Sequence, residues 1–317
     1  MSDILAIMFF LATLITAIFW LINKHQYNKF NKKKDITFGD KINHHDFFKK
    51  NRYIEYIASF FPIFITIFVV RSFIYEPFQI PSGSMIPTLL IGDFVLVEKF
   101  SYGIKDPIFH YTLMNVGKPR RGDIVVFRHP YNKKINYIKR VIGLPGDRIT
   151  YNTINKMFTI HQECNNTNNC KKEIFVSHKS YILENFKKYN TNDIRNRKDV
   201  TFYYSNNKDE KINPLLFHLF QEKIDKKVFD ILLSNQIRDQ LNEYYQQPGQ
   251  KKGIWIVPKD QYFMIGDNRD NSLDSRYWGF VPDKNLIGKA TIIWMSFDKE
   301  EHKWPVGIRL NRIGKIN

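Results

Sequence analysis

Residues 137–147 read Tyr-Ile-Lys-Arg-Val-Ile-Gly-Leu-Pro-Gly-Asp, an apolar run that ends in a turn rich in glycine and proline. A short run with β-branched residues, closed by glycine and proline, is typical of a strand and its turn. Further runs of this kind lie at 94–97, 123–127, 254–257, 262–265 and 290–295. They do not alternate with helical segments, as a doubly wound α/β fold would require. The sequence therefore predicts a mainly β domain.

A polar segment interrupts this pattern. Residues 151–253 are rich in Asn and Lys and end shortly after Pro248-Gly249. We interpret them as an inserted subdomain between two parts of the β-rich domain, 76–150 and 254–317. Within the insertion, Leu215–Tyr245 shows the apolar spacing of a helix, so we expect a helix there.

Two apolar segments precede the β-rich domain. Ile4–Ile22 holds nineteen residues without a charge, about enough to cross a ~30 Å hydrocarbon core. A cleavable signal peptide is disfavoured because no basic start and no small-x-small site accompany it. The second segment, 53–75, contains Pro62 and a shorter uncharged core, so a buried helix of a soluble domain is its alternative. We predict that 1–22 and 53–75 are transmembrane helices.

The segment between them, 23–52, sets the expected orientation. It holds eight Lys and one Arg against three Asp, and such basic loops stay in the cytoplasm. Everything after about Glu76 is then expected outside the cytoplasm. The whole chain has a formal charge of +17, but no nucleic-acid-binding motif accompanies that charge. We therefore exclude a nucleic-acid partner and expect the lipid bilayer to be one, with some lysines near anionic headgroups.

The two cysteines, Cys164 and Cys170, lie in the insertion. An oxidising compartment favours a disulfide between them, whereas a cytoplasmic location favours two free thiols. Because the orientation places them outside, we predict the disulfide. No His or further Cys lies near them at zinc spacing, so we expect no metal site.

Three clusters carry residues suited to catalysis. The first, 81–88, presents Ser82 and Ser84 on a turn around Gly83, the setting in which a nucleophilic hydroxyl lies beside free backbone N–H groups; an ordinary Ser/Gly turn is the alternative. The second is Lys139. Strand alternation puts it among apolar neighbours, which lowers the pKa of an amine and makes it a possible base. A lysine at a strand edge with its ammonium in water is the alternative.

The third cluster is Gly-Asp-Asn-Arg-Asp-Asn-Ser-Leu-Asp-Ser-Arg at 266–276. Its spacing does not fit an EF-hand calcium loop, because Arg269 and Ser272 occupy the third and sixth positions. Asp274 and Arg276 are suited to a structural ion pair, and the Ser272 hydroxyl to a hydrogen bond with a nearby amine.

These clusters, together with Arg121-Gly122-Asp123-Ile124-Val125, closely resemble the successive signature motifs of bacterial type I signal peptidase (leader peptidase) and occur in that family's order. The resemblance runs from about Glu76 to the C-terminus and is weakest in the insertion. It implies a mainly β catalytic domain with an inserted subdomain, anchored by two N-terminal transmembrane helices. It also implies a bacterial inner-membrane location, with the catalytic domain on the periplasmic face.

The resemblance further implies a role for each matching residue. Ser84 would be the nucleophile and Lys139 the general base. Ser82 would donate to the oxyanion, and Ser272 would hold the lysine amine. The supporting ion pair and the apolar surface for the P1 and P3 side chains complete the expected site: Asp274 and Arg276; Phe78, Ile80, Pro81, Tyr137 and Ile138.

The function implied is a serine endopeptidase that removes signal peptides from exported preproteins with a Ser/Lys dyad and without a metal or cofactor. One alternative is a membrane-tethered binding or assembly protein without catalysis, which would not depend on Ser84. The other is a self-cleaving Ser/Lys protease on a related β fold, which the two predicted spans disfavour.

Overall fold

The computed structural model describes residues 2–36, 52–107, 111–162, 172–175, 177–180, 199–203, 214–298, 305 and 307–316. The chain divides into two compact units. The first comprises Met1–Glu76 and Gly103–Met114, and the second Pro77–Tyr102 and Asn115–Asn317.

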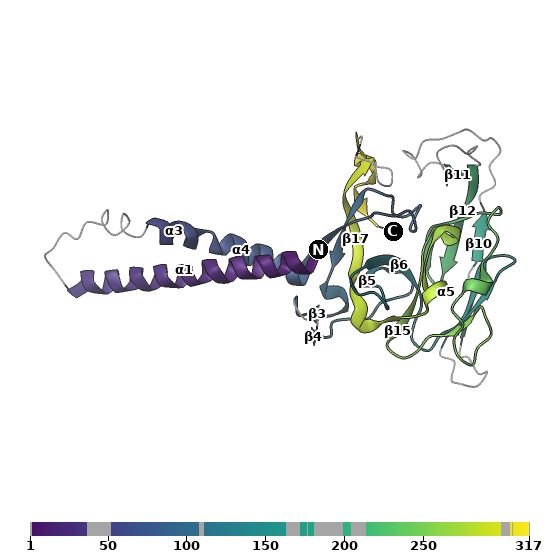
Figure 1. The fold of residues 1–317 in the computed structure, drawn as a ribbon, viewed down its shortest axis with the longest axis horizontal. Helices are drawn as coiled ribbons and strands as arrows, with labels where there is room; N and C mark the ends of the chain where they lie inside the picture. Colours follow the sequence, from purple (N-terminus) through teal and green to yellow (C-terminus); the bar gives the residue numbers. More distant parts are fainter. Residues whose placement is uncertain are drawn as a thin grey trace. The chain divides into compact units, whose positions relative to one another are not determined.

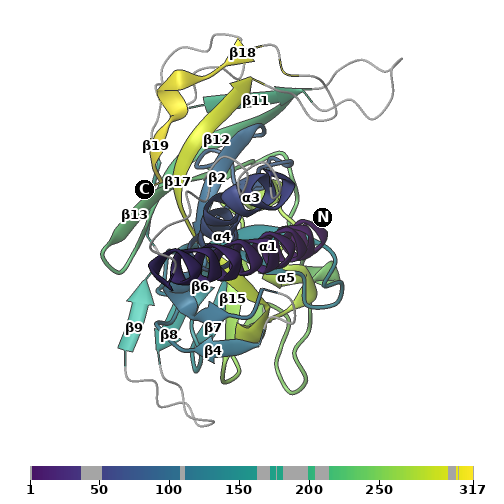
Figure 2. The ribbon, with the colours of Figure 1, turned by 90° about the vertical axis from the view of Figure 1, so that its left-hand side faces the viewer.

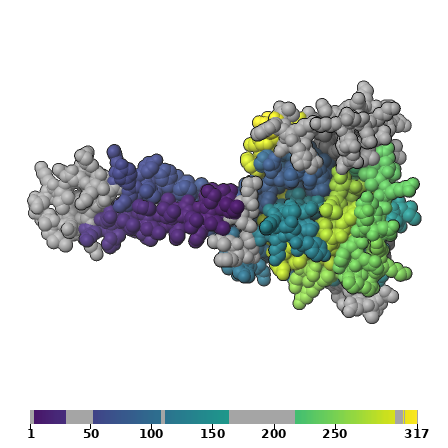
Figure 3. Space-filling view, in the orientation of Figure 1, coloured from purple at the N-terminus to yellow at the C-terminus, as the bar shows by residue number. Residues whose placement is uncertain are grey.

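The first unit is built on paired helices. Helix α1, Ser2–Ile36, runs beside α3, Arg52–Ser59, and α4, Phe61–Val69, which continues into a π-helical turn at Val70–Ile74 (Figures 1 and 3). The helix breaks between α3 and α4, because Pro62 in the first turn of α4 has no N–H to continue the hydrogen-bond ladder. A short hairpin, β3 (Ile104–Lys105) and β4 (Thr112–Met114), completes the unit.

The helix pair is apolar on the outside as well as between the helices. Aromatic rings hold α1 to α4, with centroids 5.8 Å apart for Phe10 and Phe68 and 5.3 Å apart for Trp20 and Phe61. On the outer faces Leu14 and Ile63 remain 47% and 55% exposed. By length and composition, Ile4–Lys29 and Arg52–Ile74 are candidate membrane spans. Helix α1 continues to Ile36, so the basic segment after the first apolar stretch begins as helix.

The second unit is mainly β, as the sequence predicts. In the described part of the chain its largest sheet has nine strands, with a path β1-β2-β17-β5-β6-β15-β16 and with β18 and β19 both paired to β17 (Figure 1). The strands are β1 Tyr75–Gln79, β2 Asp93–Glu98, β5 Ile124–Arg128, β6 Asn136–Gly143, β15 Gln261–Ile265, β16 Val281–Pro282, β17 Leu286–Asp298, β18 Gly307–Ile308 and β19 Gly314–Lys315.

Both faces of the large sheet are covered. On β5, Ile124 and Val126 point into one apolar cluster, while Val125 and Phe127 point into another. The first cluster includes Ile80, and the second lies against the short helix α5, Ser275–Trp278. A strand buried on both faces reads as a continuous apolar run, which is why these strands stand out in the sequence.

Two smaller sheets complete the unit. One has the order β14-β7-β8-β9, with β14 Ile254–Ile256, β7 Arg148–Asn152, β8 Met157–Gln162 and β9 Lys172–Phe175. The other is built around β12, which pairs with β10, β11 and β13: β10 Ser177–Ser180, β11 Asp199–Tyr203, β12 Pro214–Ile224 and β13 Lys227–Leu233 (Figure 2). The six runs predicted as strands are confirmed as β2, β5, β6, β14, β15 and β17.

The helix predicted over Leu215–Tyr245 is wrong. This stretch forms the antiparallel hairpin β12–β13, followed by a 3₁₀ turn at Leu241–Glu243. The hairpin turns at Asp225, whose φ of 54° lies in the left-handed region that Asp tolerates. Alternate residues such as Phe217 and Leu219 pack into one apolar cluster. Tertiary packing of aromatic and β-branched residues has overridden the helical spacing.

Candidate active site

Ser84 lies on a tight turn that is fastened to the core on both sides. Before it, Ile80 exchanges two backbone hydrogen bonds with Gly92 and Asp93, with N–O distances of 3.0 and 2.8 Å. After it, Met85 and Leu89 are fully buried in an apolar cluster. These anchors leave little freedom to the serine between them, whose own exposure is 9%.

The 266–276 segment holds the same turn from the other side. The Asn268 N–H donates to the Ser84 carbonyl at 3.1 Å, and the Asn268 side-chain amide donates to the Gly83 carbonyl at 3.1 Å. The first and third clusters of the sequence therefore meet in space.

Lys139 completes the meeting of the three clusters. It lies on β6, 2% exposed, and its Nζ is hydrogen-bonded to Ser84 Oγ. Burial lowers the pKa of Lys139 from its usual value to about 8, because the charged ammonium loses its hydration. The carboxylates of Asp274 and Asp267 oppose this shift, whereas Arg276 adds to it. The result is a buried amine in contact with a hydroxyl.

A buried ion pair lies behind the lysine. Arg140 donates through Nε and Nη2 to the two carboxylate oxygens of Asp267, at 2.8 and 2.7 Å. Thr88 Oγ1 also donates to Asp267, at 2.5 Å, which ties the end of the Ser84 turn to this pair. The sequence analysis did not identify this role of Arg140. Its signal was the position of Arg140 on the face of β6 opposite Lys139, where a buried guanidinium needs a carboxylate.

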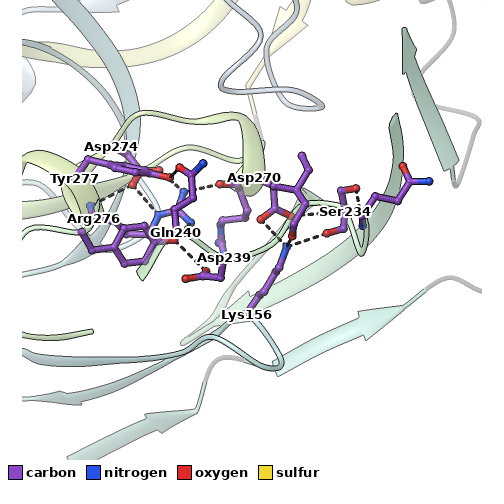
Figure 4. A network of polar contacts seen from close by, with 12 residues as sticks. Lys156, Ser234, Asp239, Gln240, Asp270, Asp274, Arg276 and Tyr277 are labelled. Atoms are coloured by element: carbon purple, nitrogen blue, oxygen red, sulfur yellow. Dashed lines mark hydrogen bonds and ion pairs between the residues drawn. The ribbon is translucent and has the colours of Figure 1, made fainter. Parts of the chain in front are cut away.

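The predicted pairing of Asp274 with Arg276 is present. Arg276 Nε and Nη2 each lie 2.9 Å from an oxygen of Asp274, which also accepts the Gly266 N–H at 3.1 Å (Figure 4). The guanidinium sits among the rings of Tyr151, Tyr244 and Tyr277, with centroids 5.7–6.0 Å away. The ion pair and the three rings together fix the 266–276 segment, from which Ser272 and Asn268 approach the Ser84 turn.

A second polar contact, which the sequence did not suggest, fixes the same segment. Lys156 Nζ donates to the carbonyls of Ser234 and Ile237 at 2.8 and 2.9 Å and to Asp270 at 2.7 Å (Figure 4). Asp270 in turn accepts the Ser234 N–H at 2.7 Å. Because Asp270 is two residues from Asn268, this contact holds the residues that hold the Ser84 turn. Nothing local in the sequence around Lys156 signals such a contact.

Ser272 lies beside the turn. It is 7% exposed, and its Oγ has no hydrogen-bond partner among the described residues. A methyl group on Gly266 would lie 2.2 Å from Ser272 Oγ and 2.6 Å from the Ser84 carbonyl oxygen, so glycine alone lets these groups approach. The hydrogen bond from Ser272 to the Lys139 amine stays a prediction.

The remaining predicted site residues differ in how far their side chains are exposed. Ser82 and Pro81 are exposed, Phe78 and Ile138 are partly buried in the same apolar cluster, and Ile80 is 2% exposed. Ile80 therefore offers little surface. Tyr137 is also partly buried, with its ring centroid 5.6 Å from Lys139 Nζ. Cys164 and Cys170 lie outside the described residues, and their disulfide stays a prediction.

With this geometry in view, comparison with known proteins gives a family. The family model for signal peptidase, peptidase S26, matches residues 53–295. The chain belongs to the signal peptidase family. This confirms the resemblance drawn from the four sequence motifs.

Relatives match over most or all of the chain. Signal peptidase I of Buchnera aphidicola subsp. Acyrthosiphon pisum is 49% identical and aligns over 100% of both chains. Signal peptidase I of Haemophilus influenzae is 37% identical over 81% of this chain and 74% of its own. Among solved structures, signal peptidase I from Enterococcus faecalis covers 56% of this chain and 100% of its own, at 24% identity and a TM-score of 0.26.

Proposed function

We propose that this member of the signal peptidase family removes signal peptides from exported preproteins with Ser84 as nucleophile and Lys139 as general base. One observation carries the proposal: a fully buried lysine, its pKa lowered to about 8, is hydrogen-bonded to the hydroxyl of a serine on a rigid turn. A pKa of 8 leaves about a tenth of the amines neutral at pH 7. That neutral amine has the lone pair that a base requires.

The proposed reaction has two stages. Neutral Lys139 takes the Ser84 hydroxyl proton as Oγ bonds to the scissile carbonyl carbon, and the resulting ammonium returns a proton to the leaving amine. The mature protein departs and leaves an acyl-enzyme. Lys139 then takes a proton from water, which attacks the ester, and the ammonium returns the proton to Ser84 Oγ as the signal peptide leaves.

The oxyanion would be held by the Ser84 N–H and the Ser82 hydroxyl. Among the described residues the Ser84 N–H has no hydrogen-bond partner, and Ser82 is exposed on the same turn. Two donors on one rigid turn support an oxyanion hole. Small P1 and P3 side chains would lie against Phe78 and Ile138, which remain partly exposed.

The proposed location follows the candidate spans. Both helices would cross the bacterial inner membrane, the basic segment 23–52 would face the cytoplasm, and the catalytic domain would face the periplasm. The division into a catalytic domain at 76–150 and 254–317 with an insertion at 151–253 is part of this proposal. A periplasmic insertion would also pair Cys164 with Cys170.

The test is cleavage of a preprotein by the full-length chain in detergent. We expect wild type to release the mature protein and Ser84→Ala to release none. Ser101→Ala is the matched control, because this serine donates to Glu98 away from the turn and should leave turnover unchanged. Turnover by a folded Ser84→Ala variant would exclude the proposed nucleophile.

A further inference from the structure

A groove lies between the β12–β13 hairpin and the C-terminal residues, in a part of the molecule that the proposed chemistry does not use. A cavity of 600 Å³ adjoins one of 240 Å³, and both are lined by Val228, Phe229 and Ile316. We call their union the hairpin groove. Its volume is in the range of ligand sites, about 300–1,000 Å³.

The β13 wall of this groove is a strand edge. In the described part of the chain β12 is the strand that pairs with β13, and near the end of β13 Leu232 forms an isolated bridge with Asn268, with its N–H donating outward to the Asp267 carbonyl at 2.9 Å. Backbone groups alternate along an antiparallel strand, so those of Val228 and Asp230 point outward as well. Both residues line the groove, and no described backbone group pairs with them on that side.

The opposite wall has the same property. Strand β19 pairs with β17, and the Ile316 N–H donates to the Thr291 carbonyl at 2.9 Å. By the same alternation, the backbone groups of Lys315 point away from β17. Lys315 lines the groove. Among the described residues, two strand edges with unpaired backbone groups thus border one cavity, which is the arrangement that accepts an added strand.

The charge of the groove favours an acidic occupant. Arg312 is 5% exposed, pairs with Asp93, and keeps its Nε without a partner among the described residues. Lys315 is exposed at the rim. Lys227 and Lys289 share a single carboxylate, that of Asp123, at 2.7 and 3.0 Å. With two cations on that carboxylate and only Asp230 as a further acid in the lining, the groove has an excess of positive charge.

The groove begins where the Ser84 turn ends. Pro87 and Thr88 line it, and Thr88 is four residues from Ser84, so their Cα atoms are at most about 15 Å apart. Its wall residues Ile124, Ala290 and Ile293 belong to the same apolar cluster as Ile80 and Ile138. The surface expected to hold the signal peptide precedes Ser84 along the turn, and the groove follows it.

We infer that the hairpin groove binds the mature part of the preprotein, as an extended strand added between β13 and β19, with a preference for acidic side chains. This inference rests on the proposed function and adds a subsite after the scissile bond. An extended segment covers about 15 Å in about five residues, so residues from about the fifth after the cleavage site would enter the groove.

The test uses the full-length chain in detergent and three preproteins with one signal peptide. Their mature segments are about two residues long, about ten residues with glutamates beyond the fifth, and about ten residues with lysines there. We expect the acidic long substrate to exceed the short one in kcat/KM by about three- to tenfold, the effect of one or two hydrogen bonds or ion pairs. The lysine substrate should show no gain.

Substitutions at two positions, Val228 and Lys315, separate the backbone contact from the charge. Val228→Pro removes an N–H that points away from β12, so it should abolish the gain for the acidic substrate, whereas Val228→Thr should keep the gain. Lys315→Glu should shift the preference from the acidic to the lysine substrate. All three variants should cleave the short substrate as wild type does.

The outcomes separate the two proposals. If active wild type cleaves all three substrates with equal kcat/KM, or if Val228→Pro keeps the gain for the acidic substrate, the groove does not bind the mature segment as inferred. Either result would leave the Ser/Lys proposal standing. A wild-type protein that cleaves none of the three would overturn both. Direct binding gives an independent readout: a labelled acidic mature peptide should bind to Ser84→Ala and not to Ser84→Ala with Lys315→Glu, and equal binding to both would contradict the inference.

Discussion

Replacing Lys139 by arginine separates a base from a structural cation. Lys139 is 2% exposed and its pKa is lowered to about 8 by burial, so about a tenth of the protein holds a neutral amine at pH 7. Arginine keeps the charge and much of the stem, but its pKa exceeds ~12 and its neutral fraction is about 10⁻⁵ or less. The fraction of protein with a neutral side chain at position 139 then falls by about 10⁴. Loss of a general base typically costs about 10²–10⁴, which sets the same scale.

The assay is single-turnover cleavage of a preprotein by full-length Lys139→Arg. We expect a fall in kcat of about 10³–10⁴. The thermal unfolding of the variant should be measured alongside kcat, because the larger side chain in a filled site costs about 1–3 kcal/mol of stability by overpacking. Lys118→Arg is the matched control, because Lys118 is exposed. Its kcat and thermal unfolding should equal those of wild type.

A second variant, Lys139→Met, separates the two roles further. Its side chain is unbranched and uncharged, so if Lys139 acts as a base, Lys139→Met should be as inactive as Lys139→Arg. A lysine needed only as a cation predicts activity in the arginine variant and its loss in the methionine variant. Near wild-type turnover by folded Lys139→Arg would refute the base role.

Three further outcomes follow from the same geometry. Because only neutral Lys139 accepts a proton, kcat/KM of wild type should rise about tenfold per pH unit below about 8 and level off above it; a profile that is flat below about 8 would contradict the lowered pKa. Ser82→Ala should lower kcat by about 10²–10³ through loss of one oxyanion donor, and a change under about threefold would remove Ser82 from the site. Gly266→Ala should reduce kcat by more than about tenfold, because its methyl group would lie 2.6 Å from the Ser84 carbonyl oxygen. Gly307→Ala, where the nearest atom is 3.9 Å away, is its control, and equal kcat in the two variants would show that the turn tolerates the methyl group.

The sequence predicted the strands because burial on both faces makes each of them a continuous apolar run. Strand β5 shows this, with four consecutive buried residues from Ile124 to Phe127. The same logic failed for the β12–β13 hairpin, where both helix and strand spacing fit. The pairing of Phe220 with Ile231 across the turn decides that case, and a local window does not contain it.

The site divides in the same way. Ser84 and Lys139 could be found because they lie inside short motifs with their own chemical logic, and Asp274 with Arg276 because they are two residues apart. The contacts that hold the turn join residues far apart in the chain: Asn268 to Ser84, and Lys156 to Asp270. Such pairs carry no local signal, since any of many polar residues could have met there.

The charges around Lys139 explain how a lysine near two carboxylates keeps a low pKa. Asp267 and Asp274 both favour the protonated amine. Each is bound in bidentate fashion by its own arginine, Asp267 by Arg140 and Asp274 by Arg276, at 2.7–2.9 Å. A carboxylate paired with a guanidinium has a field that falls off rapidly, so each pair acts on Lys139 as a weak dipole rather than as a full charge. Burial then dominates and lowers the pKa of Lys139. Arg276, which is not a base, adds to this lowering and so helps to make the lysine one.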